Sequence, residues 1–383
     1  MADTAGLSSP TVSQLARYFL GLGTWGFGGP VVLVERMRRD LQEGRGWFSV
    51  DEYREGLALA QLAPGPLAAQ LAIYLGWVRS GVLGATAVGL AFIMPSFVMV
   101  LALSVAYVRF GGLPWMQGAF YGVGAAVIAI IGHSALRLTR KTVGTDRLLW
   151  GIVIANAILT AVTEREIVWV IVASGLLVLL IRTMPRASAV MALIPAWTLT
   201  GLRGPAEPDI LATILAYFAK GGALVFGSGL AIVPFLHGGV VRDMHWLTEQ
   251  QFLDAVAVSM ITPGPVVITV AFIGYLVAGP LGACAAAAGV FLPVYLIVVS
   301  VARWFHHVAA NPQLRAAVAG VTAAATGAIA GAVVVLGRRA VTDLPTALIF
   351  AAALFVVVRV KRVPEPVILL GAGVLGVVVR GHQ

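Results

Sequence analysis

Apolar stretches long enough to cross a lipid bilayer recur along almost the whole chain, and no other feature restricts its fold as strongly. The hydrocarbon core of a bilayer is about 30 Å thick and is crossed by roughly 20 helical residues. Of the 383 residues, 59% are hydrophobic and only 11% are charged. Soluble domains carry about a quarter charged residues, so a chain this apolar cannot keep a polar surface. The stretches lack the alternation of barrel strands and therefore predict an all-α polytopic membrane protein.

The net charge of +9 does not indicate a nucleic-acid partner, because Lys and Arg lie in short connectors between the apolar stretches. Loop charges of this kind set the orientation of a protein in the lipid bilayer. The single cysteine, Cys284, cannot form an internal disulfide, and its Ala-rich surroundings predict a packed small residue. The polar N-terminus has no basic region followed by a short apolar run, so no removable signal peptide is expected.

The chain contains an internal repeat. A shift of 199 positions aligns Tyr18 with Tyr217, and the register continues without a gap to Pro66. The other matched positions are Phe27-Gly28 with Phe226-Gly227, Trp47 with Trp246, Glu55 with Asp254, Pro64-Gly65-Pro66 with Pro263-Gly264-Pro265 and, after a one-residue deletion, Pro95 with Pro293. Chance similarity between apolar helices rarely keeps Trp, Pro and Gly in register, so we infer a duplication with halves at 12–200 and 208–381.

Each half has the same order of parts. A glycine-interrupted apolar stretch is followed by a polar connector and then by a capping box, Ser49 with Glu52 in one half and Thr248 with Gln251 in the other. The helix that follows stops at Pro-Gly-Pro, and a second short helix begins at the last proline, which has no N–H to lose there. Two helices this short predict a re-entrant hairpin, with one broken crossing as the alternative.

The remaining apolar stretches predict about five spanning helices in each half. Their expected positions are 12–34, 80–109, 114–136, 148–162 and 166–183 in the first half and 209–235, 280–304, 311–337, 343–360 and 364–381 in the second. An odd number would invert the second half, unless the short apolar segment 188–200 also crosses. The distribution of positive charge favours inversion. The connector after the first crossing of the first half is rich in arginine, whereas the equivalent connector of the second half carries only Arg242. Arg338 and Arg339 would then lie outside, against the positive-inside rule.

The interrupted helices are the candidate binding elements. Carriers built from inverted repeats place broken helices at the bilayer midplane, with half-helix N-termini directed at anionic groups. Free N–H groups are expected after Pro66, on residues 67–69, and after Pro265, on residues 266–268. The predicted substrate-binding residues are Gly28, Gly29, Pro30, Gln61, Pro64, Gly65, Pro66, Gln70, Lys220, Gly227, Ser228, Gly229, Thr262, Pro263, Gly264, Pro265 and Thr269. The structural alternative is that these residues only kink the helices.

Some charged and polar residues within the apolar stretches have two interpretations. Lys220 could contribute charge to an anion path, because charge inside a membrane is costly, or could extend to the interface. Glu55 and Asp254 share one repeat position and could pair structurally or carry a coupled proton. Asn156 is expected to form an interhelical hydrogen bond.

The sequence lacks the motifs that are typical of enzyme active sites. It has no H-E-x-x-H run, no G-x-S-x-G elbow and no Walker loop, so neither a metal nor an organic cofactor is predicted. An intramembrane enzyme would need a nucleophile with a base, or a metal cluster, at membrane depth, and the sequence indicates neither. An anion channel remains a further alternative.

The motifs together resemble the chromate ion transporter family in its long, two-domain form. The first half contributes Phe27-Gly28-Gly29-Pro30, Gly46-Trp47-Phe48-Ser49 and the segment 59–72 around Pro64-Gly65-Pro66. The second half contributes Phe226-Gly227-Ser228-Gly229, Trp246-Leu247-Thr248, Thr262-Pro263-Gly264-Pro265-Val266, Phe272-Ile273-Gly274-Tyr275-Leu276 and Phe291-Leu292-Pro293. The resemblance covers essentially the whole chain.

This resemblance implies a multi-pass carrier in the bacterial inner membrane that exports chromate, with sulfate as the similar ion. Import or exchange of sulfate or another oxyanion is the alternative within the same class. Many family members have a histidine shortly after the first Gly-Gly-Pro, whereas Val31, Val32 and Leu33 follow here. This difference bears on substrate preference. The sequence leaves open whether the protein forms a homodimer.

Overall fold

The structure is a computed structural model that describes residues 10–27, 29–110, 113–163, 168–182, 209–224, 232–303, 305, 312–360 and 363–380. The regular elements in these residues are helices, which confirms the all-α prediction. Four segments are long and apolar enough to cross a membrane: Leu67–Phe110, Pro114–Arg140, Val266–Ala302 and Arg315–Ala340. The chain is therefore a membrane protein, and it also contains several shorter apolar helices.

The two halves contain equivalent elements. The first half has α1 (Val12–Trp25), α2 (Gly29–Met37), η1 (Arg38–Gly44), α3 (Val50–Leu62), α4 (Leu67–Phe110), α5 (Pro114–Val143), α6 (Arg147–Thr163) and α7 (Val168–Arg182). The second half has α8 (Asp209–Leu224), α9 (Ile232–Leu236), η4 (His237–Asp243), α10 (Glu249–Ile261), η5 (Val266–Ile268), α11 (Thr269–Ala302), α13 (Pro312–Ala340), α14 (Leu344–Arg359) and α15 (Glu365–Arg380). The π-helices η1 and η4 occupy the same repeat position, as do α3 and α10, so the duplication extends to local structure.

Both α4 and α11 consist of two segments joined by a sharp reversal. Helical geometry is lost at Ser80-Gly81 in α4 and at Ala278-Gly279 in α11, and both glycines have a positive φ. A Cβ added to Gly76 would lie 2.4 Å from the carbonyl oxygen of Gly84. In one continuous helix these residues would be about 12 Å apart, so the segments before and after the reversal pack directly on each other. Spans predicted to begin at 80 and 280 therefore start at the reversals.

The stretch 12–34, predicted as one crossing, is divided into α1 and α2. The chain then returns along α1, because the Tyr18 hydroxyl donates to Asp40 at 3.2 Å and the Arg45 guanidinium lies 5.2 Å from the Tyr18 ring. A Cβ on Gly26 would lie 2.2 Å from the Leu22 carbonyl oxygen, so the bend requires glycine. The prediction of a single spanning helix here was wrong.

The equivalent stretch 209–235 behaves in the same way. Helix α8 ends at Leu224 and α9 begins at Ile232, and the intervening residues lie outside the described ranges. The Tyr217 hydroxyl donates to the carbonyl oxygen of Phe235 at 2.8 Å, and their rings stack 4.8 Å apart. Helix α9 therefore lies against α8 rather than extending it, which corrects the second prediction of one crossing.

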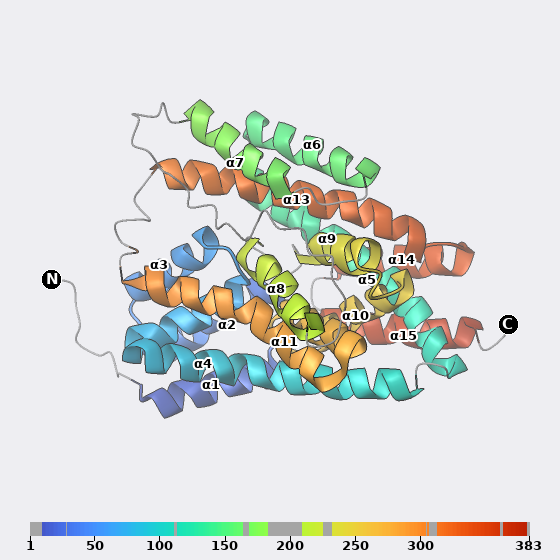
Figure 1. The fold of residues 1–383 in the computed structure, drawn as a ribbon, viewed down its shortest axis with the longest axis horizontal. Coiled ribbons are helices and arrows are strands. Elements are labelled where there is room, and N and C mark those ends of the chain that lie inside the picture. The colour runs from blue at the N-terminus through green and yellow to red at the C-terminus, as the bar shows by residue number, and fades with distance from the viewer. Residues whose placement is uncertain are drawn as a thin grey trace.

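The two halves interlock by reciprocal packing. Helix α1 packs on α4 and α8 packs on α11, and α4 and α11 pack on each other (Figure 1). Helix α5 of the first half packs on α14 and α15 of the second, while α13 of the second half packs on α6 and α7 of the first. Helices α5 and α13 also contact each other. Neither half is a separate bundle, so the central elements of both are held in one core.

The connectors that precede α3 and α10 lie near opposite ends of the long segment of α4. Glu52, near the start of α3, pairs with Arg79, just before the reversal. Asp254 of α10 accepts a hydrogen bond from Tyr107, close to the other end of α4, at 2.7 Å. Positions 82 and 107 are separated by about 40 Å along a helix that rises 1.5 Å per residue.

The structure tests two further predictions made from the sequence. The Asn156 amide donates to Ser174 of α7 at 3.4 Å, which confirms the interhelical hydrogen bond. Cys284 is exposed on α11, so its prediction as a packed residue was wrong. Ala283 and Ala286 on the same helix are buried, whereas the Cys284 side chain is exposed. The segment 188–200, which the sequence left undecided, lies outside the described residues.

Candidate substrate site

Each Pro-Gly-Pro turn follows a helix with a defined start and end. The Ser49 hydroxyl accepts from the Glu52 N–H at 3.1 Å, and the Glu52 carboxylate accepts from the Ser49 N–H at 2.8 Å. Thr248 and Gln251 make the same exchange at 3.2 and 2.9 Å. Both predicted capping boxes are thus confirmed. Helices α3 and α10 end at equivalent positions directly before the turns, because proline cannot continue the backbone hydrogen-bond ladder.

The two turns reach across to elements of the opposite half. The Gly264 N–H donates to the carbonyl oxygen of Gly26 at 3.0 Å, and the Ser96 hydroxyl donates to the carbonyl oxygen of Pro263 at 2.7 Å. A Cβ on Gly65 would lie 2.9 Å from Val294, which is the repeat counterpart of Ser96. Each turn therefore packs beside the proline of the other half's long helix.

A small cavity lies where the two turns meet. Its volume is about 10 Å³, and its lining residues are Pro30, Leu33, Pro66, Ala68, Gly264, Pro265 and Val266. The structure thus brings together four residues that the sequence predicted for one substrate site, from both halves. A space of this volume admits about one water molecule, so a tetrahedral oxyanion with five heavy atoms does not fit between the turns in this conformation.

Backbone donors face this region at the start of the helix after each turn. Among the described residues, no acceptor contacts the N–H groups of Leu67, Ala68 and Ala69, and the first helical bond runs from Gln70 to Pro66. In the second half the Ile268 N–H donates to Pro265 at 2.9 Å, because the chain begins with a tighter 3₁₀ turn. The prediction that Ile268 offers a free donor was therefore wrong.

Several predicted side-chain donors are occupied within their own turns. The buried amide nitrogen of Gln70 donates to the carbonyl oxygens of Pro64 at 2.6 Å and Ala63 at 3.3 Å. The Thr269 hydroxyl donates to Val266, and the Thr262 hydroxyl donates to Val258 and Ser259. In this conformation these residues stabilise the turns that hold the backbone donors in place.

The other predicted site residues are more scattered. Gln61 is exposed near the end of α3, and Lys220 is exposed on α8. Gly29 starts α2 with a φ of 74°. Gly28, Gly227, Ser228 and Gly229 lie outside the described residues.

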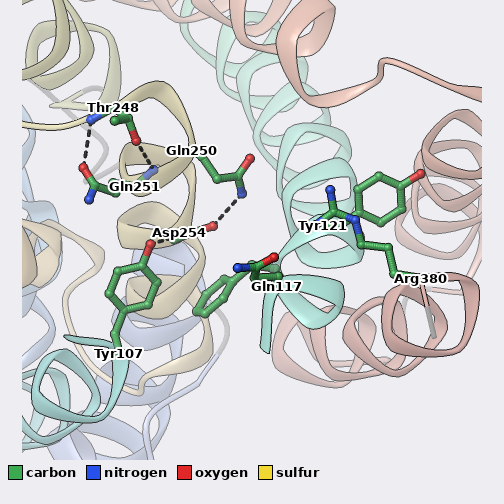
Figure 2. Close-up of a pocket in the computed structure, with 9 residues that line it drawn as sticks. Tyr107, Gln117, Tyr121, Thr248, Gln250, Gln251, Asp254 and Arg380 are labelled. Atoms are coloured by element: carbon green, nitrogen blue, oxygen red, sulfur yellow. Dashed lines mark hydrogen bonds between the residues drawn. The ribbon is translucent and has the colours of Figure 1, made fainter. Parts of the chain in front are cut away.

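A second, larger cavity lies away from the turns, at the end of α4 near Tyr107 (Figure 2). Its volume is about 310 Å³, and its lining residues are Tyr107, Gln117, Phe120, Tyr121, Thr248, Gln250, Gln251, Asp254 and Arg380. Asp254 is 3% exposed and accepts hydrogen bonds from Tyr107 at 2.7 Å and Gln250 at 2.8 Å. These residues come from α4, α5, α10 and α15, so both halves build this cavity too.

Comparison with known proteins identifies the family. The chromate transporter family profile matches the chain twice, over residues 13–179 and 212–377. The chain belongs to the chromate transporter family.

Curated relatives match over nearly their full length. A protein named "Chromate transport protein" from Cupriavidus metallidurans is 55% identical over 96% of this chain and 93% of its own length. A "Probable chromate transport protein" from Synechococcus elongatus is 56% identical over 96% and 95%. A "Chromate transport protein" from Pseudomonas aeruginosa is 33% identical over 97% and 93%. No solved structure matches. The chain is thus a transporter and not an enzyme.

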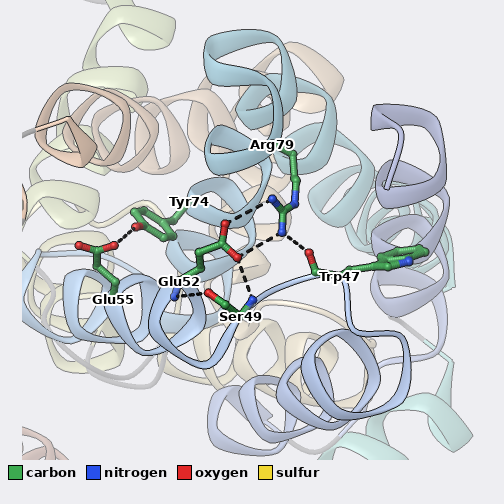
Figure 3. Close-up of polar contacts among 6 residues, drawn as sticks. All are labelled: Trp47, Ser49, Glu52, Glu55, Tyr74 and Arg79. Atoms are coloured by element: carbon green, nitrogen blue, oxygen red, sulfur yellow. Dashed lines mark hydrogen bonds and ion pairs between the residues drawn. The ribbon is translucent and has the colours of Figure 1, made fainter. Parts of the chain in front are cut away.

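In this chromate transporter family member, the connector before α3 is held by a partly buried arginine (Figure 3). Arg79 pairs with both carboxylate oxygens of Glu52 at 3.2 and 3.3 Å and donates to the Trp47 carbonyl oxygen. Its guanidinium also lies 4.3 Å from the centre of the Phe48 ring. Arg79 is therefore a structural anchor of this connector.

The two repeat-related carboxylates have different surroundings in this member of the family. Glu55 accepts a hydrogen bond from Tyr74 of its own half at 3.1 Å, as Figure 3 shows. Asp254 accepts from Tyr107 of the opposite half. This difference could not be predicted from the sequence, because the two tyrosines stand at positions that the repeat does not match.

Sequence reasoning missed Ser96, Tyr107, Gln117 and Arg380. Ser96 had a usable signal, since it is a polar residue directly after Pro95 in an apolar run and aligns with Val294. The others lie near the ends of predicted crossings, where polar residues are common. No local pattern indicated that they would share a cavity.

Proposed function

We propose that this chain is a carrier of the bacterial inner membrane that exports chromate, or a similar tetrahedral oxyanion such as sulfate, from the cytoplasm. The observation that carries this proposal is the meeting of the two Pro-Gly-Pro turns across one small cavity, in a chain 55% identical to a chromate transport protein. A helix N-terminus offers unpaired N–H groups and about half a positive charge, which suits an anion. The turns would bind it from two sides.

Transport would proceed by alternating access. The cavity between the turns has a volume of only about 10 Å³, so the turns must separate before an oxyanion enters. Each turn is the tip of a two-helix unit, α3 with the first segment of α4 and α10 with the first segment of α11. We assign these units as re-entrant hairpins, within halves spanning 12–200 and 208–381. Their separation toward one side and then the other would expose the site alternately.

The halves would be inverted relative to each other. Contacts between helices support this inversion. The start of α3 lies beside Arg79 and the start of α10 lies beside Tyr107, near opposite ends of the long segment of α4 that follows the reversal. The arginine-rich connector around η1 would then face the cytoplasm and the η4 connector the outside.

Single cysteines test this orientation. On a Cys284→Ala background, Glu43→Cys in the first connector and Asp243→Cys in the second are expected to react with an impermeant maleimide from opposite sides of the membrane. Both native side chains are exposed, so the reagent can reach each position. Labelling of both from the same side would contradict the inverted arrangement.

Membrane potential is the expected driving force. A cell interior is negative, and one charge crossing 100 mV is worth about 2.3 kcal/mol, so an exported dianion would gain roughly 4.6 kcal/mol if no other charge moves. In inside-out vesicles, uptake of labelled chromate should rise when the lumen is made positive at fixed pH. Uptake that is saturable but indifferent to the potential would indicate electroneutral exchange, and flux without saturation would indicate a channel.

Glu55 and Asp254 are the carboxylates that we assign to any proton coupling. Each accepts a hydrogen bond from a tyrosine, and Asp254 is buried beside the large cavity. Burial makes an ionised carboxylate costly unless its hydrogen bonds are satisfied. Loss of a pH-gradient effect in Asp254→Asn vesicles, with the potential effect retained, would support this role.

Lys220 is expected to add positive charge to the anion path. Its side chain is exposed on α8, the helix that packs on α11. Lys220→Met should raise the KM for chromate by roughly tenfold, the worth of one charged hydrogen bond, while Lys220→Arg should retain part of the affinity. Arg17→Gln, an exposed cation on the equivalent helix α1, is the control. Equal KM values for wild type and Lys220→Met would assign Lys220 to interfacial anchoring.

A further inference from the structure

The large cavity near Tyr107 is lined by an arginine, Arg380. The equivalent arginine of the first half, Arg182, forms an ion pair. Helices α7 and α15 occupy equivalent repeat positions and end at Arg182 and Arg380. Arg182 forms an ion pair with Asp146, the residue directly before α6. Asp343, directly before α14, is the corresponding acid. The same arrangement would therefore pair Arg380 with Asp343.

The second half does not repeat this ion pair. The Tyr121 hydroxyl donates to Asp343 at 2.5 Å, and the Arg380 guanidinium lies 5.0 Å from the centre of the Tyr121 ring. The hydroxyl and backbone N–H of Thr346, together with Tyr121, hold the pKa of Asp343 below its usual value, and the charge of Arg380 makes a smaller contribution in the same direction. Asp343 is thus satisfied by other donors, and within the described ranges no carboxylate lies within ion-pair distance of Arg380.

The remaining lining of the cavity leaves two donors directed at its interior. Arg380 is exposed and lines the cavity, and the side-chain amide of Gln117 forms no hydrogen bond with any described residue (Figure 2). Both oxygens of the one lining carboxylate, Asp254, already accept hydrogen bonds, from Tyr107 and Gln250. On the same helix, Glu249 is paired with His237 and Arg339. Arg380 is therefore the only cation among the lining residues.

We propose that this cavity is a second oxyanion site, a vestibule in which Arg380 and Gln117 bind a tetrahedral divalent anion outside the central site. Guanidinium and amide N–H groups match the acceptor geometry of such an anion, and the hydrogen bonds are charge-assisted. A volume of about 310 Å³ accommodates the ion with part of its hydration shell. The proposal rests on the proposed function for the class of anion and for the assignment of this end of α4 to the outside, where the site would receive the exported ion.

Sided flux measurements test the vestibule. Proteoliposomes of sorted orientation would be used to measure chromate efflux toward the Arg380 side while sulfate is added on that side. We expect added sulfate to slow efflux in the wild type, and the half-inhibiting concentration to rise by roughly tenfold in Arg380→Gln, because one charge-assisted contact is lost. Arg380→Lys should lie between the two, and Gln117→Leu should show a smaller rise. The KM measured from the opposite side should not change.

The repeat supplies the matched control. Arg182→Gln removes the equivalent arginine from an ion pair and should leave the half-inhibiting sulfate concentration within about twofold of the wild type. Equal shifts in Arg380→Gln and Arg182→Gln, no shift in either, or an equal change in KM from both sides would overturn the vestibule. Sulfate binding to protein in lipid nanodiscs separates the two proposals. If the wild type binds sulfate, Arg380→Gln does not, and the wild type transports neither chromate nor sulfate, the proposed function is overturned and the vestibule still stands.

Discussion

Replacement of Gly264 by alanine is expected to abolish most chromate transport while the protein stays folded in the membrane. Gly264 has a φ of 99°, and an added Cβ would lie 1.9 Å from the Ser96 hydroxyl oxygen. That hydroxyl cannot simply rotate away, since it donates to Pro263. Strain and overpacking of roughly 1–3 kcal/mol each would displace the turn from the opposite half and lower the transport rate by about tenfold or more.

The matched control is Gly279→Ala. Gly279 also has a positive φ, of 62°, but no atom lies within 4 Å of its added Cβ. The Gly279→Ala variant therefore measures the effect of backbone strain alone, without crowding by a neighbouring atom. Chromate uptake and thermal stability would be measured for both variants, with Gly65→Ala as the repeat equivalent. If Gly264→Ala and Gly279→Ala lose transport to the same extent, crowding between the two halves is not the cause.

Arg79→Ala is expected to lower the free energy of unfolding by about 2–4 kcal/mol, because it leaves a half-buried carboxylate without its cation. The Arg79 side chain is 15% exposed and that of Glu52 is 30% exposed. Arg79 also binds the Trp47 carbonyl oxygen and covers the Phe48 ring, so the whole connector loses its anchor. Denaturation of the purified protein by a mixed-micelle titration would measure the loss.

Arg54→Ala provides the comparison on helix α3, which also carries Glu52. Its ion pair with Asp51 has side chains that are 76% and 91% exposed, and such pairs contribute under about 1 kcal/mol. Arg79→Lys should retain part of the stability but not the two-oxygen contact with Glu52. Similar losses for Arg79→Ala and Arg54→Ala would show that burial of the Arg79 guanidinium does not stabilise the connector.

Much of the local structure could be predicted from the sequence because its causes are local. A capping box satisfies its own helix terminus within four residues, so Ser49 and Thr248 marked the starts of α3 and α10 correctly. Proline lacks an N–H wherever it occurs, so both Pro-Gly-Pro sequences marked the ends. The repeat register also placed Glu55 with Asp254 and the long helices with their prolines at equivalent positions.

The stretches 12–34 and 209–235 show where hydropathy fails. Their composition is that of a spanning helix, yet α1 and α2 separate at the glycines and the chain returns along Tyr18. Hydropathy measures only the preference of a segment for lipid or protein interior over water. It does not distinguish a segment that crosses from one that folds back against another helix, because both bury apolar surface.

The sequence by itself determined the membrane environment, the duplication, the helix termini and the two Pro-Gly-Pro turns, since each follows from residues close together in the chain. Only the tertiary structure decided that Gly264 binds Gly26, that Ser96 binds Pro263 and that Arg380 shares a cavity with Gln117. These partners are far apart in sequence and belong to opposite halves. They meet because α5 and α13 each pack on the last two helices of the other half, and that interlocking depends on the summed packing of many apolar side chains rather than on any one motif.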